Sequence, residues 1–164
     1  MNTISIKKSI YIETSVISYL TAKPNRDLII TARQQITRNW WEDIRQKFEA
    51  YISTYVIDEI SQGDTLASKS RLQAIYGFNL LPASGEIENL AKQYFKKMKI
   101  PEHAMYDCLH LACGVLNGMD IIVSWNFKHI ANPVIRQVLR EINQKLGFET
   151  PEITTPEELI EGEI

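Results

Sequence analysis

The sequence predicts a single α/β domain whose central sheet is mostly parallel and is flanked by helices on both faces. Short strand-prone runs alternate with amphipathic helical patterns along the 164 residues, as in sheets built from crossover helices. We find no internal repeat, low-complexity segment or interdomain linker. We expect the domain to cover residues 1–150 and a C-terminal tail with a short helical turn to cover residues 151–164.

The expected elements follow from hydrophobic periodicity and from capping residues. The predicted strands are Ser9–Ile12, 50–54, 80–81 and 120–123. The predicted helices begin near Val16 and continue with 27–48, a short helix around Val56 to Ile60, 66–76, a helix after Ser84, 103–116, Pro133–Leu146 and a turn over 156–160. Trp40 and Trp41 are adjacent in the second pattern and cannot share a direction on a regular helix, so we expect one of them near the surface.

Composition narrows the classes of function. A net charge of −2 and a pI near 5.9 argue against a protein that holds nucleic acid mainly by bulk charge. The sequence has no run of about eighteen apolar residues, so no membrane span is predicted. Glu13 interrupts the only N-terminal stretch that could resemble a signal peptide. We therefore expect a cytoplasmic protein. Cys108 and Cys113 are five residues apart on an expected helix, so they should be reduced core thiols rather than a disulfide or zinc site.

Four oxygen-bearing side chains are predicted to meet at one edge of the sheet. Glu13 ends the first strand, Glu59 lies in the helix after the second, Asp107 lies in the helix before the fourth, and Asn126 follows the fourth. Carboxyl ends of parallel strands share an edge, and clustered carboxylates bind Mg²⁺ or Mn²⁺. Each carboxylate taken singly is also consistent with a solvated charge or a helix cap. His110 falls on the helix face that carries Asp107, either near bound water or phosphate or as a packed histidine.

The motifs IYIETSVISYL, VIDEISQGD, DCLHLACG and IIVSWNFKHIAN together resemble the ordered motifs of PIN-domain ribonucleases. The resemblance is specifically to the VapC-like toxins of type II toxin–antitoxin systems and covers nearly the whole chain. It implies a PIN-like fold with catalytic residues Glu13, Glu59 and Asp107, and with metal ligands Glu13 and Asp107. The fourth metal position falls at Asn126. The family usually has Asp in place of both Glu13 and Asn126, so a single tightly bound ion is expected.

The resemblance also implies hydrolysis of RNA phosphodiester bonds with Mg²⁺ or Mn²⁺, leaving a 5′-phosphate and a 3′-hydroxyl. Glu59 is the carboxylate expected to help take the proton from the attacking water. The RNA-contact residues we expect are Thr14, Ser15, Trp125, Lys128 and His129. For these five the alternatives are helix capping by Thr14 and Ser15, a core position for Trp125, and plain surface exposure for Lys128 and His129.

Other classes of function have less support in the sequence. A PIN-like module that binds RNA or protein with little catalysis is favoured by Asn126, while the three retained acids favour an enzyme. A nucleotide-dependent enzyme is disfavoured because no GxGxxG or GxxxxGK[ST] motif follows the first strand, and an aspartyl phosphatase is disfavoured because Glu13 has no second acid two residues later. The partners implied are an RNA substrate, a cognate antitoxin and a second copy of the chain, with Trp40 and Trp41 as a contact region.

Overall fold

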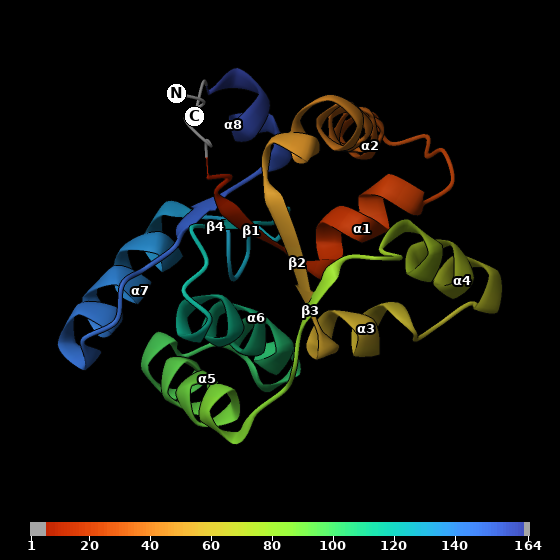
Figure 1. Cartoon of the computed structure of the whole chain (residues 1–164). Helices are drawn as coiled ribbons and strands as arrows, with labels where there is room; N and C mark the ends of the chain where they lie inside the picture. The colour runs from red at the N-terminus through yellow and green to blue at the C-terminus, as the bar shows by residue number, and fades with distance from the viewer. Residues whose placement is uncertain (1–5, 163–164) are drawn as a thin grey trace.

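The computed structural model describes residues 6–162 and contains one five-stranded parallel sheet with helices on both faces (Figure 1). The strand order is β3-β2-β1-β4-β5, and every neighbouring pair is parallel. The strands are β1 (Ser9–Ile12), β2 (Glu49–Ser53), β3 (Asn79–Leu81), β4 (Ile121–Val123) and β5 (Glu152–Thr154). The predicted fold class is confirmed.

The central strand β1 is buried on both faces, which explains its uninterrupted apolar sequence. Ile10, Tyr11 and Ile12 are fully buried, and they pair with β2 on one side and with β4 on the other. Because side chains alternate along a strand, Tyr11 points to the face opposite to that of its two neighbours. The first residue beyond this buried strand, Glu13, therefore emerges in the middle of the carboxyl edge of the sheet.

The helices divide between the two faces of the sheet (Figure 1). One face is covered by α5 (Gly85–Met98), α6 (Met105–Leu116) and α7 (Pro133–Leu146), while α1 (Thr14–Thr21), α2 (Leu28–Asn39) and α8 (Pro156–Glu161) cover the other. The helices α3 (Thr54–Ile60) and α4 (Thr65–Ala74) follow β2 and lead to β3. A 3₁₀ turn, η3 (Glu102–Ala104), precedes α6. No helix within residues 6–162 is long and apolar enough to cross a membrane.

The helix predicted over residues 27–48 is divided into three segments. After α2 the backbone forms a π-helical turn, η1 (Trp40–Ile44), and a 3₁₀ turn, η2 (Arg45–Lys47). A π turn inserts an extra residue into the helix, so the two adjacent tryptophans both reach the protein interior. Trp40 is fully buried, and Trp41 stacks on Phe78 with ring centroids 5.5 Å apart. Of the two tryptophans proposed as a contact region, only Trp41 is therefore partly accessible to a partner.

The segment expected to be a tail extends the sheet. Residues Glu152–Thr154 form β5, which pairs with β4, and α8 then packs against α2 and η1. The predicted cap of the final turn is confirmed, because Thr155 and Glu158 form a reciprocal capping box. Three strand residues between Pro151 and Thr155 are too few to show a periodicity, which is why the sequence did not reveal the fifth strand.

The amino edge of the sheet is fastened by a polar clamp between β1 and the residue before β4. The carboxylate of Asp120 accepts hydrogen bonds from the backbone N–H and the hydroxyl of Ser9, at 2.7 and 2.9 Å. The backbone N–H of Asp120 donates to the same hydroxyl at 3.0 Å. These bonds fix the register of β1 and β4 at the edge opposite to Glu13.

Candidate active site

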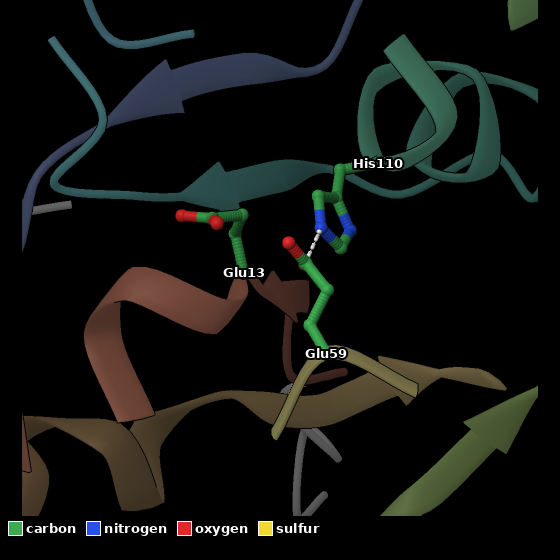
Figure 2. Close-up of side chains that lie close together, drawn as sticks. All are labelled: Glu13, Glu59 and His110. Carbon is green, nitrogen blue, oxygen red and sulfur yellow. Dashed lines mark hydrogen bonds and ion pairs between the residues drawn. The ribbon is translucent and has the colours of Figure 1, made fainter. Parts of the chain in front are cut away.

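The expected acidic side chains gather at the carboxyl edge of β1, β2 and β4. Glu13 lies at the junction of β1 and α1, Glu59 on α3, and Asp107 on α6, while Asn126 follows β4. His110 enters from the next turn of α6 after Asp107, and Figure 2 shows Glu59 directed toward its imidazole with Glu13 alongside. The side chains form two hydrogen-bonded groups, one around Glu59 and His110 and one around Asp107.

Glu13 is a buried carboxylate that also caps a helix. It is 4% exposed, and it accepts hydrogen bonds from the N–H of Ser15 at 3.1 Å, the hydroxyl of Ser15 at 2.5 Å and the hydroxyl of Ser124 at 2.6 Å. Burial raises the pKa of Glu13, and the nearby charge of His110 and the serine donors oppose this only in part. The two serine hydroxyls hold one oxygen of this carboxylate in a fixed direction.

Glu59 and His110 form a close ion pair. Nε2 of His110 lies 2.5 Å from Oε1 of Glu59, which also accepts a hydrogen bond from the hydroxyl of Thr14 at 2.6 Å. Burial acts to raise the pKa of Glu59, but the hydrogen bond and charge of His110 outweigh it and lower that pKa. Burial likewise acts to lower the pKa of His110, but the bond to Glu59 and the charges of Glu13, Glu59 and Asp107 raise it. Each partner therefore favours the charged form of the other.

A buried framework holds the imidazole from behind. Nδ1 of His110 lies 2.6 Å from the hydroxyl of Tyr11, and that hydroxyl lies 2.7 Å from the hydroxyl of Ser53. All three side chains are fully buried. Burial raises the pKa of Tyr11 well above its ordinary value, so the phenol stays neutral and available for hydrogen bonding. Tyr11 comes from β1 and Ser53 from β2, so the ring orientation of His110 is set by the sheet itself.

Asp107 has partners of its own. One carboxylate oxygen accepts a hydrogen bond from the side-chain amide of Asn126 at 2.9 Å, and the other lies 2.8 Å from Nδ1 of His129. The amide oxygen of Asn126 in turn accepts the backbone N–H of His129 at 3.1 Å. Asp107 and Asn126 were both expected to bind the metal. In the structure they are hydrogen-bonded to each other and to His129 instead.

The donor set fits a divalent cation at Glu13, Glu59 and His110. Each offers one ligand atom, and these three atoms lie within 4.8 Å of one another. Two ligands on opposite sides of an ion, each at about 2.1 Å, are about 4.2 Å apart. Atoms within 4.8 Å of one another therefore need to approach by at most about 0.6 Å to share one coordination sphere. Among the described residues Asp107 is not part of this group of three.

The remaining expected contacts differ in their exposure. Thr14 and Ser15 donate to the two glutamates and orient them. Trp125 is buried, its indole N–H donates to the hydroxyl of Thr37 at 2.8 Å, and Tyr19 packs against its ring. The core alternative for Trp125 therefore matches the structure, and its ring offers no free face for a base. Lys128 is exposed beside the site, and His129 is partly exposed.

Two residues of the site were missed at the sequence level. Ser124 directly follows β4 as Glu13 follows β1, and this equivalent position was the available signal. Tyr11 lies inside an apolar strand, where its sequence context is that of a core residue. Only the three-dimensional structure shows that its hydroxyl meets His110.

No family model matches the chain, and no curated protein matches its sequence. Solved structures do match its fold. One is VapC20 of Mycobacterium tuberculosis, described as a sarcin–ricin loop cleaving toxin, with a TM-score of 0.56 and 14% identity over 73% of this chain and 92% of the other. Another is VapBC2 of Rickettsia felis bound to a DNA fragment from its promoter, with a TM-score of 0.57 and 11% identity over 89% of this chain and 97% of the other. This chain therefore has the PIN-like fold of VapC toxins.

Proposed function

We propose that the protein is a metal-dependent endoribonuclease and the toxin of a toxin–antitoxin pair. The observation that carries the proposal is the convergence of Glu13, Glu59 and His110 at the carboxyl edge of a fold shared with VapC proteins. Ligands and catalytic groups bind at this edge in open α/β sheets. A structural neighbour with the same fold is described as a toxin that cleaves the sarcin–ricin loop, which supports RNA as the substrate class.

The cation that fits the site is Mg²⁺ or Mn²⁺. When bound, such an ion supplies an activated water nucleophile and neutralises charge on the scissile phosphate. Glu13 is oriented by Ser15 and Ser124, and its buried carboxylate carries the charge that a cation would offset. Two close carboxylates also repel one another, and a cation removes this cost.

The other side chains have distinct proposed roles. The side chain of Glu59 is 29% exposed, so it is placed to accept a proton from attacking water. Asp107 is hydrogen-bonded to Asn126 and His129 and forms the side of the site next to Lys128. In this position the three side chains would orient the RNA backbone as it enters from solvent. Lys128 is exposed on this side of the site, where its ammonium group can contact an RNA phosphate.

The test is cleavage of a structured RNA by the purified chain with Mn²⁺ or Mg²⁺. We expect products with a 5′-phosphate and a 3′-hydroxyl, and no cleavage in EDTA. Glu13→Gln, Glu59→Gln and Asp107→Asn should each lower the rate by about 100-fold or more. Glu88→Gln on the exposed side of α5 is the matched control and should leave the rate unchanged. Full activity of Asp107→Asn or Glu13→Gln would contradict the assignment.

A second function is favoured by one observation. Both oxygens of Asp107 are engaged by Asn126 and His129, as in a site used for binding rather than cutting. In that case the protein is a PIN-like module that holds RNA or protein with little catalysis. A Mn²⁺ titration separates the two functions, because the module would bind labelled RNA at every Mn²⁺ concentration and leave it intact.

The proposed partners are an antitoxin and a second copy of the chain. The proposal is supported by the likeness to VapBC2, and Trp41 is the accessible residue of the contact region proposed from the sequence. Co-expression with the product of the neighbouring gene, followed by gel filtration and light scattering, should give a complex larger than the free chain. A free monomer under all conditions would contradict both partners.

A further inference from the structure

We propose that Nε2 of His110 is a direct ligand of the divalent cation, beside Glu13 and Glu59. The site would then prefer a first-row transition ion such as Mn²⁺ over Mg²⁺. This inference rests on the proposed function, because it assumes that the metal site exists. It departs from the expectation that α6 supplies its ligand through Asp107.

The geometry places the imidazole nitrogen inside the coordination sphere. His110 is fully buried, and its Nε2 lies 2.5 Å from Oε1 of Glu59. The two residues and Glu13 each offer a ligand atom, and these three atoms lie within 4.8 Å of one another (Figure 2). Two neighbouring ligands at about 2.1 Å from an ion and at right angles are about 3 Å apart. The nitrogen and oxygen would therefore separate by about 0.5 Å. Glu59 can provide this movement, because it is the most accessible of the three.

The framework behind the ring can accommodate the tautomer that a metal needs. Nδ1–H of His110 can donate to the oxygen of Tyr11, whose own hydroxyl then donates to Ser53. In the ion pair with Glu59, Nε2 carries the shared proton. A cation would displace this proton to solvent, and the lone pair of Nε2 would then be directed into the site. Histidine ligands in proteins commonly donate their other ring N–H to such a partner, and that partner raises the basicity of the ligand.

The competing ligand on α6 is committed elsewhere. Asp107 bonds to Asn126 and His129, whereas His110 faces the two glutamates one turn later. With His110 in place of Asp107 as the ligand from α6, the ion would have a nitrogen donor where an oxygen donor was expected. Mg²⁺ is a hard ion that takes oxygen ligands and retains its waters, whereas imidazole binds the first-row transition ions well. The nitrogen donor therefore sets the expected preference.

The experiment is pulsed electron paramagnetic resonance of Mn²⁺ bound to the full chain, which detects a coordinated ¹⁴N nucleus directly. We expect nitrogen modulation in the wild type and in the His103→Gln His129→Gln variant, in which His110 is the only histidine. His110→Gln should lose the modulation. Competition binding should show Mn²⁺ at least about tenfold tighter than Mg²⁺ in the wild type. Tyr11→Phe should weaken Mn²⁺ binding by about 10–100-fold.

The outcomes separate this inference from the proposed function. Bound Mn²⁺ with RNA cleavage but without nitrogen modulation would overturn the role of His110 and leave the nuclease proposal intact. Failure of Mn²⁺ to bind at all would overturn both. If His110→Gln does not fold, the variant with His110 as its single histidine still decides, because absence of modulation there overturns the inference.

Discussion

Gly114 offers a sharp test of how α6 is seated on the sheet. An alanine Cβ at this position would lie 2.6 Å from Cδ1 and 2.9 Å from Cγ1 of Ile122 on β4. Ordinary contacts between carbon atoms are about 3.5–4.0 Å. Ile122 is fully buried, so α6 or Ile122 must move by about 1 Å to accept the extra methyl group.

Two opposing terms set the size of the effect. Overpacking a well-filled core costs about 1–3 kcal/mol, and replacing glycine by alanine inside a helix gains about 1 kcal/mol. We therefore expect Gly114→Ala to lower the free energy of unfolding by about 1 kcal/mol. Gly85→Ala is the matched control, because a Cβ there would meet no atom within 4 Å beyond its own chain neighbours, and its φ is not positive. That variant should be neutral or slightly more stable.

Urea unfolding followed by tryptophan fluorescence measures both changes, and a double-mutant cycle isolates the contact. Ile122→Val alone should cost about 0.5–1.5 kcal/mol. In the Gly114→Ala background it removes Cδ1, the nearer of the two clashing atoms, and leaves Cγ1 in place. A coupling of about 1 kcal/mol is therefore expected. Additive effects, or a Gly114→Ala protein more stable than the wild type, would refute the reasoning. Because His110 lies one turn before Gly114, Gly114→Ala should also weaken Mn²⁺ binding.

Three further results are expected. Glu158 accepts hydrogen bonds from Arg136, and although partial burial acts to raise the pKa of Glu158, these bonds outweigh it and lower that pKa. Glu158→Gln should therefore cost at most about 1 kcal/mol at pH 7, since solvent screens this half-exposed pair. The difference should shrink as the pH falls from 4.5 and should vanish only below the lowered folded-state pKa, where the carboxylate is protonated in both states. A difference that is as large at about pH 2 as at pH 7 in urea titrations would contradict this. Burial raises the pKa of Cys108 and Cys113 to about 12, so a thiol reagent at pH 8 should label them only after urea unfolding, and rapid labelling of the native chain would disprove their burial. Asn132 caps α7 through the N–H of Ile135 at 2.9 Å, and its amide N–H donates to the carbonyl of Phe127 at 2.7 Å. Asn132→Ala should therefore cost about 1 kcal/mol or more in thermal unfolding. Asn132→Asp should recover only part of this, because a carboxylate can accept the N–H of Ile135 but cannot donate to a carbonyl.

The sequence predicted best the elements whose ends carry their own signals. β1 and α7 have the predicted limits, Ser9–Ile12 and Pro133–Leu146. For α7 the signals are Asn132 at its start and Gly147 at its end, where φ is +80°. The π turn at Trp40–Ile44 had no such signal, because apolar spacings of three and four residues continue through it.

The candidate site was predictable to the level of which backbone positions meet. Parallel strands and short connections bring Glu13, Glu59 and Asp107 to one edge, as the residue order indicates. Side-chain direction is a different quantity, since it depends on partners that are distant in sequence. Tyr11 is 99 positions from His110, and no local pattern reveals that its hydroxyl meets that ring.

Glu13, the N-cap of α1, affects both the stability of the fold and the charge of the site. Glu13 ends β1, accepts the N–H of Ser15, and places a charge where burial disfavours it. An uncharged amide at this position keeps an oxygen for the cap and removes the buried charge. Glu13→Gln should therefore fold at least as well as the wild type while losing the cation. A carboxylate at this position therefore lowers stability relative to an amide, which is the cost expected of a residue whose charge serves a site rather than the fold.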